Sequence, residues 1–219
     1  RKLIKARMAA LKNLRELNIA TSLIVVIAKD LNEAEVKNTF QFAAEPENAH
    51  IREVFFMGLR LLGSARDQVT RDTGSTLSER RLMPDDLITL FTEQNPNIRR
   101  QDILNFNKLY FALLSAFKVK KCLYIQHYLL LRGSNGSVTP ISEIVNLERL
   151  GKAADDYAHN RLKHPRVAKA RFLSRLTLLF ANRKAAAHGL DLIRLQMLFK
   201  TGMNLKDVPN SLLLLGFIT

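Results

Sequence analysis

The excess positive charge of this chain lies inside apolar segments with helical spacing, and not in charged tails. The sequence has 34 Lys and Arg against 20 Asp and Glu, a net charge of +14. Residues 149–184 hold ten of these basic residues but only two acids, Asp155 and Asp156. The ten are Arg149, Lys152, Arg161, Lys163, Arg166, Lys169, Arg171, Arg175, Arg183 and Lys184. A folded surface of this kind repels itself and is stabilised by an anionic partner, for which phosphate is the obvious chemistry.

The composition predicts an all-α fold. A chain of 219 residues that is 47% hydrophobic can bury a full core, and its nine Gly and six Pro are few for a turn-rich β fold. Apolar residues recur at helical spacing in several stretches. We expect helices over Ile19–Lys29, Glu33–Ala44, Ala49–Leu62, Pro84–Phe91, Arg100–Phe117, Lys118–Arg132, Pro165–Ala181 and Leu205–Phe217.

The strongest break in the sequence is the Gly, Ser and Asn cluster at 132–137. It predicts an N-terminal lobe over residues 18–133 and a C-terminal lobe over residues 134–219, with a basic cleft between them. Residues 1–15 carry six basic residues and no acid. This pattern fits a transit peptide or an amphipathic arm that packs on a neighbour, and we favour a helical arm over residues 1–17.

Several classes of function lack their sequence signals. No apolar run approaches the length of a membrane span, and the single cysteine, Cys122, excludes an internal disulfide framework. Asp155 and His159 have the spacing of a metal-binding pair, but no third ligand follows at a conventional distance. No phosphate-binding glycine loop and no nucleophile triad is apparent. We therefore expect a protein that is not an enzyme, without a metal or another cofactor.

The basic residues are candidates for phosphate contacts, because Arg binds phosphate oxygens bidentately and Lys acts as a point charge. The RNA-binding candidates are Arg60, Arg66, Arg71, Arg99, Arg100, Lys108, Lys118, Lys120, Lys121, Arg161, Lys163, Arg166, Lys169, Arg171 and Arg175. Aromatic residues beside them could stack on unpaired bases. These candidates are Phe56, Phe106, Tyr110 and Tyr124, and the apolar residues of the arm are Leu3, Ile4, Met8, Leu11 and Leu14.

The order of the segments resembles the nucleocapsid proteins of segmented negative-strand RNA viruses of the bunyavirus type, notably the phlebovirus and tenuivirus branch. The residues that carry the resemblance are Ile51–Arg60, Gly63–Arg71, Arg99–Lys108, Ala112–Phe117, Leu198–Lys200 and Leu214–Phe217. The resemblance implies two helical lobes around an RNA slot, with Arg60, Arg66 and Arg71 on the phosphate-binding stretch. It also implies an N-terminal arm, residues 1–17, that docks on the next protomer.

The sequence thus favours a protein that encapsidates single-stranded RNA without sequence preference, as a homo-oligomer and with polymerase or ribonucleoprotein partners. Such a protein would occupy the virion and the host cytoplasm. A second interpretation is an organellar α-helical-repeat protein of the mitochondrial matrix, bound to ribosomal RNA or to an RNA-processing assembly. A third is a helical scaffold for an acidic protein.

Overall fold

A computed structural model describes residues 2–59, 81–119, 125–133, 135–187, 206 and 208–218. The chain begins with helix α1 (Lys2–Glu16), strand β1 (Thr21–Ile27), helix α2 (Glu35–Ala44), the short helix η1 (Pro46–Asn48) and strand β2 (Ile51–Gly58). Helices α4 (Pro84–Gln94) and α5 (Arg100–Ala116) follow, and then strands β3 (Gln126–Arg132) and β4 (Val138–Pro140). The last elements are η3 (Ile141–Glu143), α6 (Leu147–Asn160), α7 (Pro165–Phe180), α8 (Arg183–Ala187) and β5 (Leu212–Ile218).

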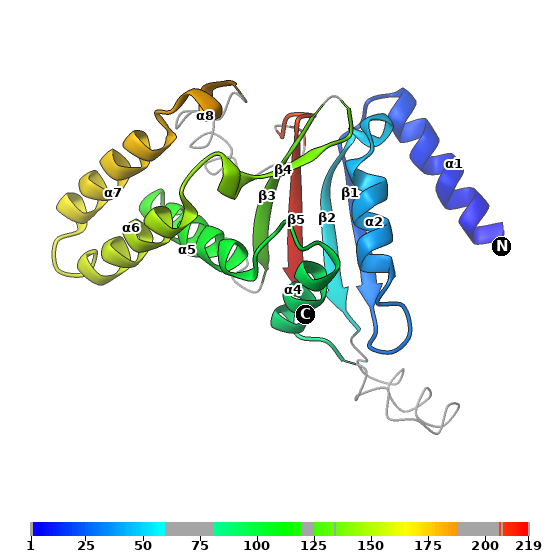
Figure 1. Ribbon diagram of the computed structural model, residues 1–219, viewed down its shortest axis with the longest axis horizontal. Helices are drawn as coiled ribbons and strands as arrows, with labels where there is room; N and C mark the ends of the chain where they lie inside the picture. The colour runs from blue at the N-terminus through cyan, green and yellow to red at the C-terminus, as the bar shows by residue number, and fades with distance from the viewer. Residues whose placement is uncertain are drawn as a thin grey trace.

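Five strands form one mixed sheet with the order β1-β2-β5-β3-β4 (Figure 1). The first three strands in this order are parallel, and β3 is antiparallel to both β5 and β4. The fold is therefore mixed α/β, and the prediction of an all-α protein is wrong. Helices were predicted over Ile19–Lys29, Ala49–Leu62, Lys118–Arg132 and Leu205–Phe217, and these stretches contain β1, β2, β3 and β5.

The error has a physical cause in the central strands. β2 and β5 are buried along nearly their whole length, so β5 and the Val54–Met57 part of β2 are apolar runs that lack the alternation of a half-exposed strand. A short apolar run of this kind cannot be distinguished from a buried helix by periodicity alone. The helices expected at Pro84, Arg100 and Pro165 are confirmed as α4, α5 and α7.

The sheet also joins the two predicted lobes. β5, from the C-terminal part of the chain, lies between β2 and β3 and pairs with both. The break near Gly133 is the turn between β3 and β4, and not a boundary between two separate helical units.

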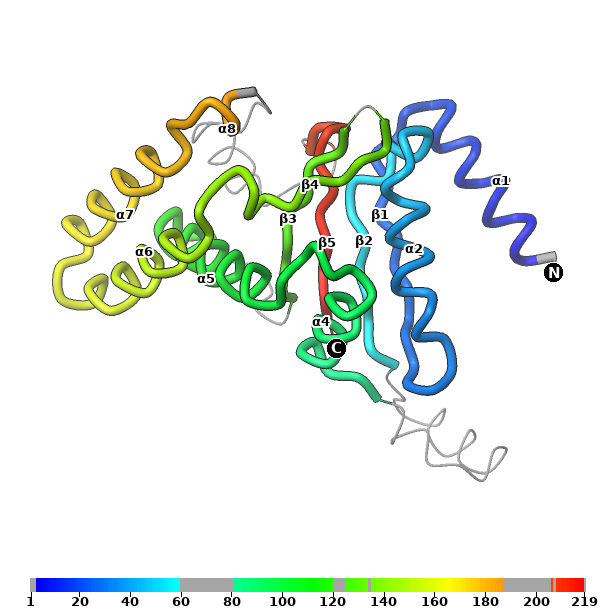
Figure 2. Tube along the Cα trace, in the orientation of Figure 1, coloured from blue at the N-terminus to red at the C-terminus, as the bar shows by residue number. Residues whose placement is uncertain are grey.

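Helices α2 and α4 cover one face of the sheet over β1, β2 and β5. The rings of Phe56, Phe91 and Phe217 pack there at centroid distances of 5.6–6.0 Å. At the other end of the sheet α5 packs against β3, where the Oδ1 atom of Asn107 accepts a hydrogen bond of 2.7 Å from the His127 backbone N–H. From α5 the helices α6 and α7 lead away from the sheet, and α1 points away at the opposite side (Figure 2).

A buried arginine holds the sheet edge where β3 ends and β2 and β5 begin. Arg132 is only 7% exposed, and its guanidinium donates to five backbone carbonyl oxygens. The acceptors belong to Ala43, Ala49, Ile51, Asn210 and Leu212. Burial, followed by the charge of Arg52, lowers the pKa of Arg132 to about 10, so the group remains charged at neutral pH. One side chain thus connects α2, β2, β3 and the start of β5.

His50 and Arg52 lie beside this arginine and are also buried, at 3% and 5% exposure. Arg52 donates to the carbonyl of Ala49, and neither ring nitrogen of His50 has a hydrogen-bond partner within the described residues. Burial lowers the pKa of His50 below 6.5, and the charges of Arg15, Arg52 and Arg132 lower it further. The imidazole is therefore neutral in the folded protein at neutral pH.

We predict that Arg132→Met lowers the free energy of unfolding by about 3–5 kcal/mol, because several buried carbonyls lose their donor at once. Urea denaturation measures the change. Arg149→Met is the control, since Arg149 is exposed and its loss should change stability by no more than about 0.5 kcal/mol. Equal stabilities of the two variants would contradict the role of Arg132.

We also predict that acid destabilises the fold through His50. The unfolded chain takes up a proton near pH 6.5 whereas the buried imidazole does not, so stability is full above that pH and decreases as the pH falls below it. In His50→Leu the decrease in melting temperature from about pH 7 to about pH 5 should be smaller than in the unchanged protein. His159→Leu, at an exposed position, should keep the original pH dependence.

Candidate nucleic-acid interface

The basic segment 149–184 forms an antiparallel helical hairpin, α6 and α7, at the end of the molecule opposite α1 (Figure 1). The side chain of Asn146 caps α6 by accepting a hydrogen bond of 2.9 Å from the Arg149 N–H. A Cβ atom at Gly151 would lie 2.7 Å from Oδ1 of Asn105, so the glycine lets α6 approach α5 closely. Pro165 occupies the first turn of α7, where its missing N–H has no cost.

The two helices of the hairpin pack through apolar side chains one helical turn apart. On α7 the buried residues are Ala168, Phe172, Leu176 and Phe180. The ring of Phe172 stacks on Tyr157 of α6 with a centroid distance of 4.9 Å and an interplanar angle of 21°. This packing leaves the basic side chains of α7 on its other faces, because residues at i and i+4 share one side of a helix.

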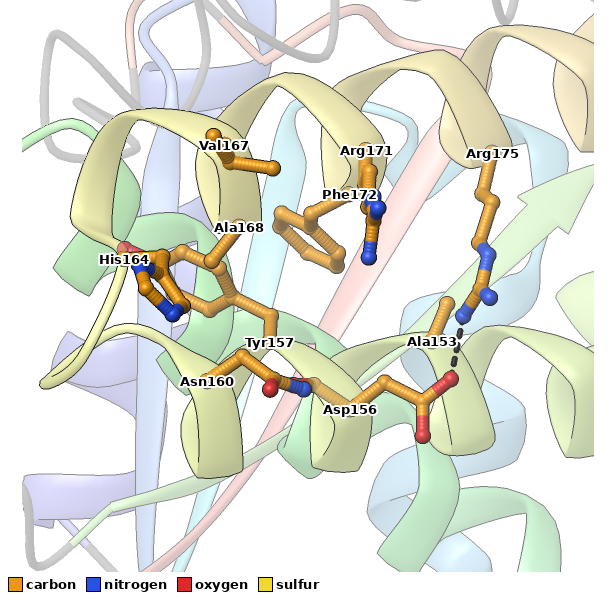
Figure 3. A pocket seen from close by; sticks show the side chains of 10 residues that line it. All are labelled: Ala153, Asp156, Tyr157, Asn160, His164, Val167, Ala168, Arg171, Phe172 and Arg175. Atoms are coloured by element: carbon orange, nitrogen blue, oxygen red, sulfur yellow. Dashed lines mark hydrogen bonds and ion pairs between the residues drawn. The ribbon is translucent and has the colours of Figure 1, made fainter.

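A pocket of about 280 Å³ lies between α6 and α7 (Figure 3). Phe172 lies in its wall together with polar side chains from both helices and from the turn between them. The polar residues are Asp156, Asn160, His164, Arg171 and Arg175. A second hollow of about 380 Å³ adjoins it, shares Ala153, Asp156 and Arg175 with it, and is also lined by Arg149 and Lys152. Together the two form a groove along the hairpin.

Four of the predicted RNA-binding residues are paired with carboxylates. Arg99 donates two hydrogen bonds, of 2.9 and 3.0 Å, to the buried carboxylate of Asp102, and this contact raises the pKa of Arg99. The Nζ atom of Lys108 lies 2.7 Å from Oδ2 of Asp155. The other two pairs are Arg100 with Asp85 and Arg175 with Asp156. The positive charge of these residues is therefore largely compensated within the molecule.

Two more candidates attach the hairpin to α5. Arg161 donates to the hydroxyl of Ser115, and the ammonium of Lys169 lies 5.2 Å from the ring centroid of Phe117. Both contacts join the hairpin to the C-terminal part of α5. We therefore assign Arg161 and Lys169 a structural role beside any contact with a ligand.

The remaining basic residues of the hairpin have no carboxylate partner within the part of the chain that the structure describes. Among the predicted residues these are Lys163, Arg166 and Arg171, which are all exposed. Lys118, at the end of α5, is also exposed and has no carboxylate partner in this part of the chain. Arg149, Lys152 and Arg183 are also exposed and unpaired in this part of the chain. These unpaired cations give the hairpin an exposed positive surface.

The predicted base-stacking residues do not form a surface. Phe56, Phe106 and Tyr110 are at most 2% exposed in the core, so their prediction as stacking platforms is wrong. Phe56 contacts other rings under α4, and Phe106 contacts Tyr128 of β3. Arg60, Arg66, Arg71, Lys120, Lys121 and Tyr124 lie outside the described residues.

The predicted arm is a helix with an uncovered apolar face. In α1 the side chains of Leu3, Ile4 and Met8 are 50–65% exposed, and Leu11 and Leu14 are half-buried. Its base is held by an ion pair of 3.3 Å between Arg15 and Glu47.

Of the side chains that line the groove, the sequence predicted Arg171 and Arg175 but not Tyr157, Asn160 or His164. Tyr157, Asn160 and His164 stand in the stretch that was considered for a metal, where Asp155 pairs with Lys108. The described residues contain no group of three or more His, Cys, Asp or Glu that could hold a metal ion. The sequence does contain a signal for this groove. Tyr157 and Asn160 are spaced i, i+3, which places them on one face of α6, and basic residues lie on both sides of them in the sequence.

No protein-family model and no curated protein matches this sequence. Within the described residues, no helix combines the length and the hydrophobicity that crossing a bilayer requires.

Proposed function

We propose that the protein binds single-stranded RNA without sequence preference, through the α6–α7 hairpin, and that it is not an enzyme. The observation that carries this proposal is the separation of its basic residues into two groups. Arg99, Arg100 and Lys108 are paired with carboxylates, whereas Lys163, Arg166 and Arg171 on the hairpin are exposed and unpaired within the described residues. Unpaired cations on one projecting element release counterions when they bind a phosphate chain.

The mixed α/β fold differs from the helical architectures behind two of the interpretations drawn from the sequence. A mixed sheet is not the two-lobed helical architecture that the resemblance to nucleocapsid proteins implied, and it is not a helical repeat. The proposal of RNA binding therefore rests on the hairpin, and not on fold analogy. The free cations support contacts with the phosphate backbone, which carry no sequence information by themselves.

We further propose that the protein self-associates through α1 when it coats RNA. The apolar side chains of Leu3, Ile4 and Met8 are exposed along one helix that points away from the sheet. A single helix with an uncovered apolar face gains stability by packing on another surface. A second copy of the chain is the partner that we infer.

The triple variant Lys163→Gln, Arg166→Gln and Arg171→Gln tests the RNA site. We expect its affinity for a 20-nucleotide single strand to fall about tenfold or more, and the slope of log K against log salt to become shallower by about two. Fluorescence anisotropy over a series of salt concentrations measures both quantities.

The matched control removes three charges that already have partners, by Lys12→Gln, Arg100→Gln and Lys108→Gln. It changes the net charge equally and should retain most of the affinity and of the salt dependence. If the two triple variants lose affinity equally, binding is a response to net charge and the hairpin is not the site.

A second prediction concerns α1. We expect Ile4→Glu with Met8→Glu to reduce self-association of the RNA complex, because both side chains place charge on the apolar face. Sedimentation velocity measures the change. Lys5→Gln with Lys12→Gln alters the net charge by the same amount on the same helix and should leave self-association intact.

A further inference from the structure

The pocket between α6 and α7 combines an apolar wall, built on the stacked rings of Phe172 and Tyr157, with polar side chains at its rim. In Figure 3 the ring of Phe172 lies between the two helices, with His164 on one side and Arg171 on the other. Val167 and Ala168 of α7 and Ala153 of α6 add apolar wall. Its volume of about 280 Å³ lies just below the range of about 300–1,000 Å³ that is usual for small-ligand pockets, and its walls are two packed helices. One ring system fits such a space, and a base pair within a duplex does not.

The polar groups at the rim offer both donors and acceptors. Asn160 uses its Nδ2 to donate a hydrogen bond of 2.8 Å to the backbone oxygen of Asp156, which leaves its side-chain oxygen as an acceptor. The carboxylate of Asp156 engages Arg175 through Oδ2 and has a second oxygen beside the pocket. Arg171 is exposed and has no carboxylate partner within the described residues, so it can donate. Nucleobases present donors and acceptors on their edges and apolar faces to both sides.

We infer that this pocket binds one unpaired nucleobase of an RNA strand, with the adjoining phosphates on Arg171 and its basic neighbours. The inference rests on the proposed RNA-binding function and adds the element that selects single strands. The hollow beyond the Asp156–Arg175 pair, flanked by Arg149 and Lys152, continues the path of the strand along the same groove.

The preference between single-stranded and duplex RNA tests the inference, because charge alone favours the duplex, which has the higher charge density. The probes are a 12-nucleotide single strand with one 2-aminopurine at its centre and a 12-base-pair RNA duplex. We expect the full chain to bind the single strand more tightly, with a change in 2-aminopurine fluorescence. Val167→Trp should then lower the affinity for the single strand five- to tenfold and abolish the fluorescence change, with the duplex affinity unaltered.

Val167 is 51% exposed, so tryptophan fills the pocket mouth without entering the core, and Val167→Phe is the smaller second variant. Leu162→Trp is the matched control, since Leu162 is 86% exposed and does not line the pocket. It should bind both probes as the unchanged protein does.

The outcomes separate the two proposals. If the unchanged protein binds neither probe at low salt, the proposed RNA-binding function fails. If it binds RNA but Val167→Trp has the affinity of the Leu162→Trp control for the single strand, the hairpin binds phosphate only and the base pocket is refuted. If oligoglutamate of equal charge displaces the single strand as well as unlabelled RNA does, the groove takes an acidic peptide and the base pocket is likewise refuted.

Discussion

The buried guanidinium of Arg132 is the interaction on which the arrangement of this fold depends. A mixed sheet brings the end of an antiparallel strand next to the beginnings of two parallel strands, and the carbonyls at this junction cannot all be paired by the ladder. Arg132, the last residue of β3, donates to carbonyls of α2, β2 and the start of β5, and to the carbonyl of Ala49. These carbonyl dipoles stabilise the buried charge of Arg132. The neighbouring Arg52 carries the same sign and disfavours that charge. Segments that are far apart in the sequence therefore meet at one side chain.

Positive charge has three distinct physical uses in this protein. Arg52 and Arg132 are buried and bind backbone carbonyls, so they serve the fold. A second set, which includes Arg99 and Lys108, is paired with carboxylates on or near α5 and α6. A third set, on α6, α7 and the turn between them, is exposed and has no carboxylate partner within the described residues. The gross count of 34 Lys and Arg therefore overstates the number of cations that are open to an external polyanion.

The sequence predicts the helices of this fold much better than its strands. Pro84 and Pro165 open helices where expected, since proline suits the first turn. β1 had a usable signal in its run of Ile and Val, which favours strands, whereas β2 and β5 are buried on both faces and match a helix equally well. For the candidate interface, the sequence locates the basic residues but not their pairing. Residues 149–184 were identified as basic, but the pairing of Lys108 with Asp155 spans 47 positions, so only the folded chain reveals which cations are compensated.

The route from the sheet to the hairpin explains why the free charge lies where a ligand can reach it. Asn107 of α5 satisfies the backbone N–H of His127 in β3, so α5 is joined to the sheet by a buried hydrogen bond as well as by apolar packing. α6 then packs on α5 and α7 on α6, each step leading farther from the sheet (Figure 2). The acidic residues of the segment 30–47 lie near β1 and α2, at the other end of the sheet. The exposed cations of the hairpin therefore lie away from these carboxylates, while Asp155 and Asp156 of α6 itself are already paired with Lys108 and Arg175.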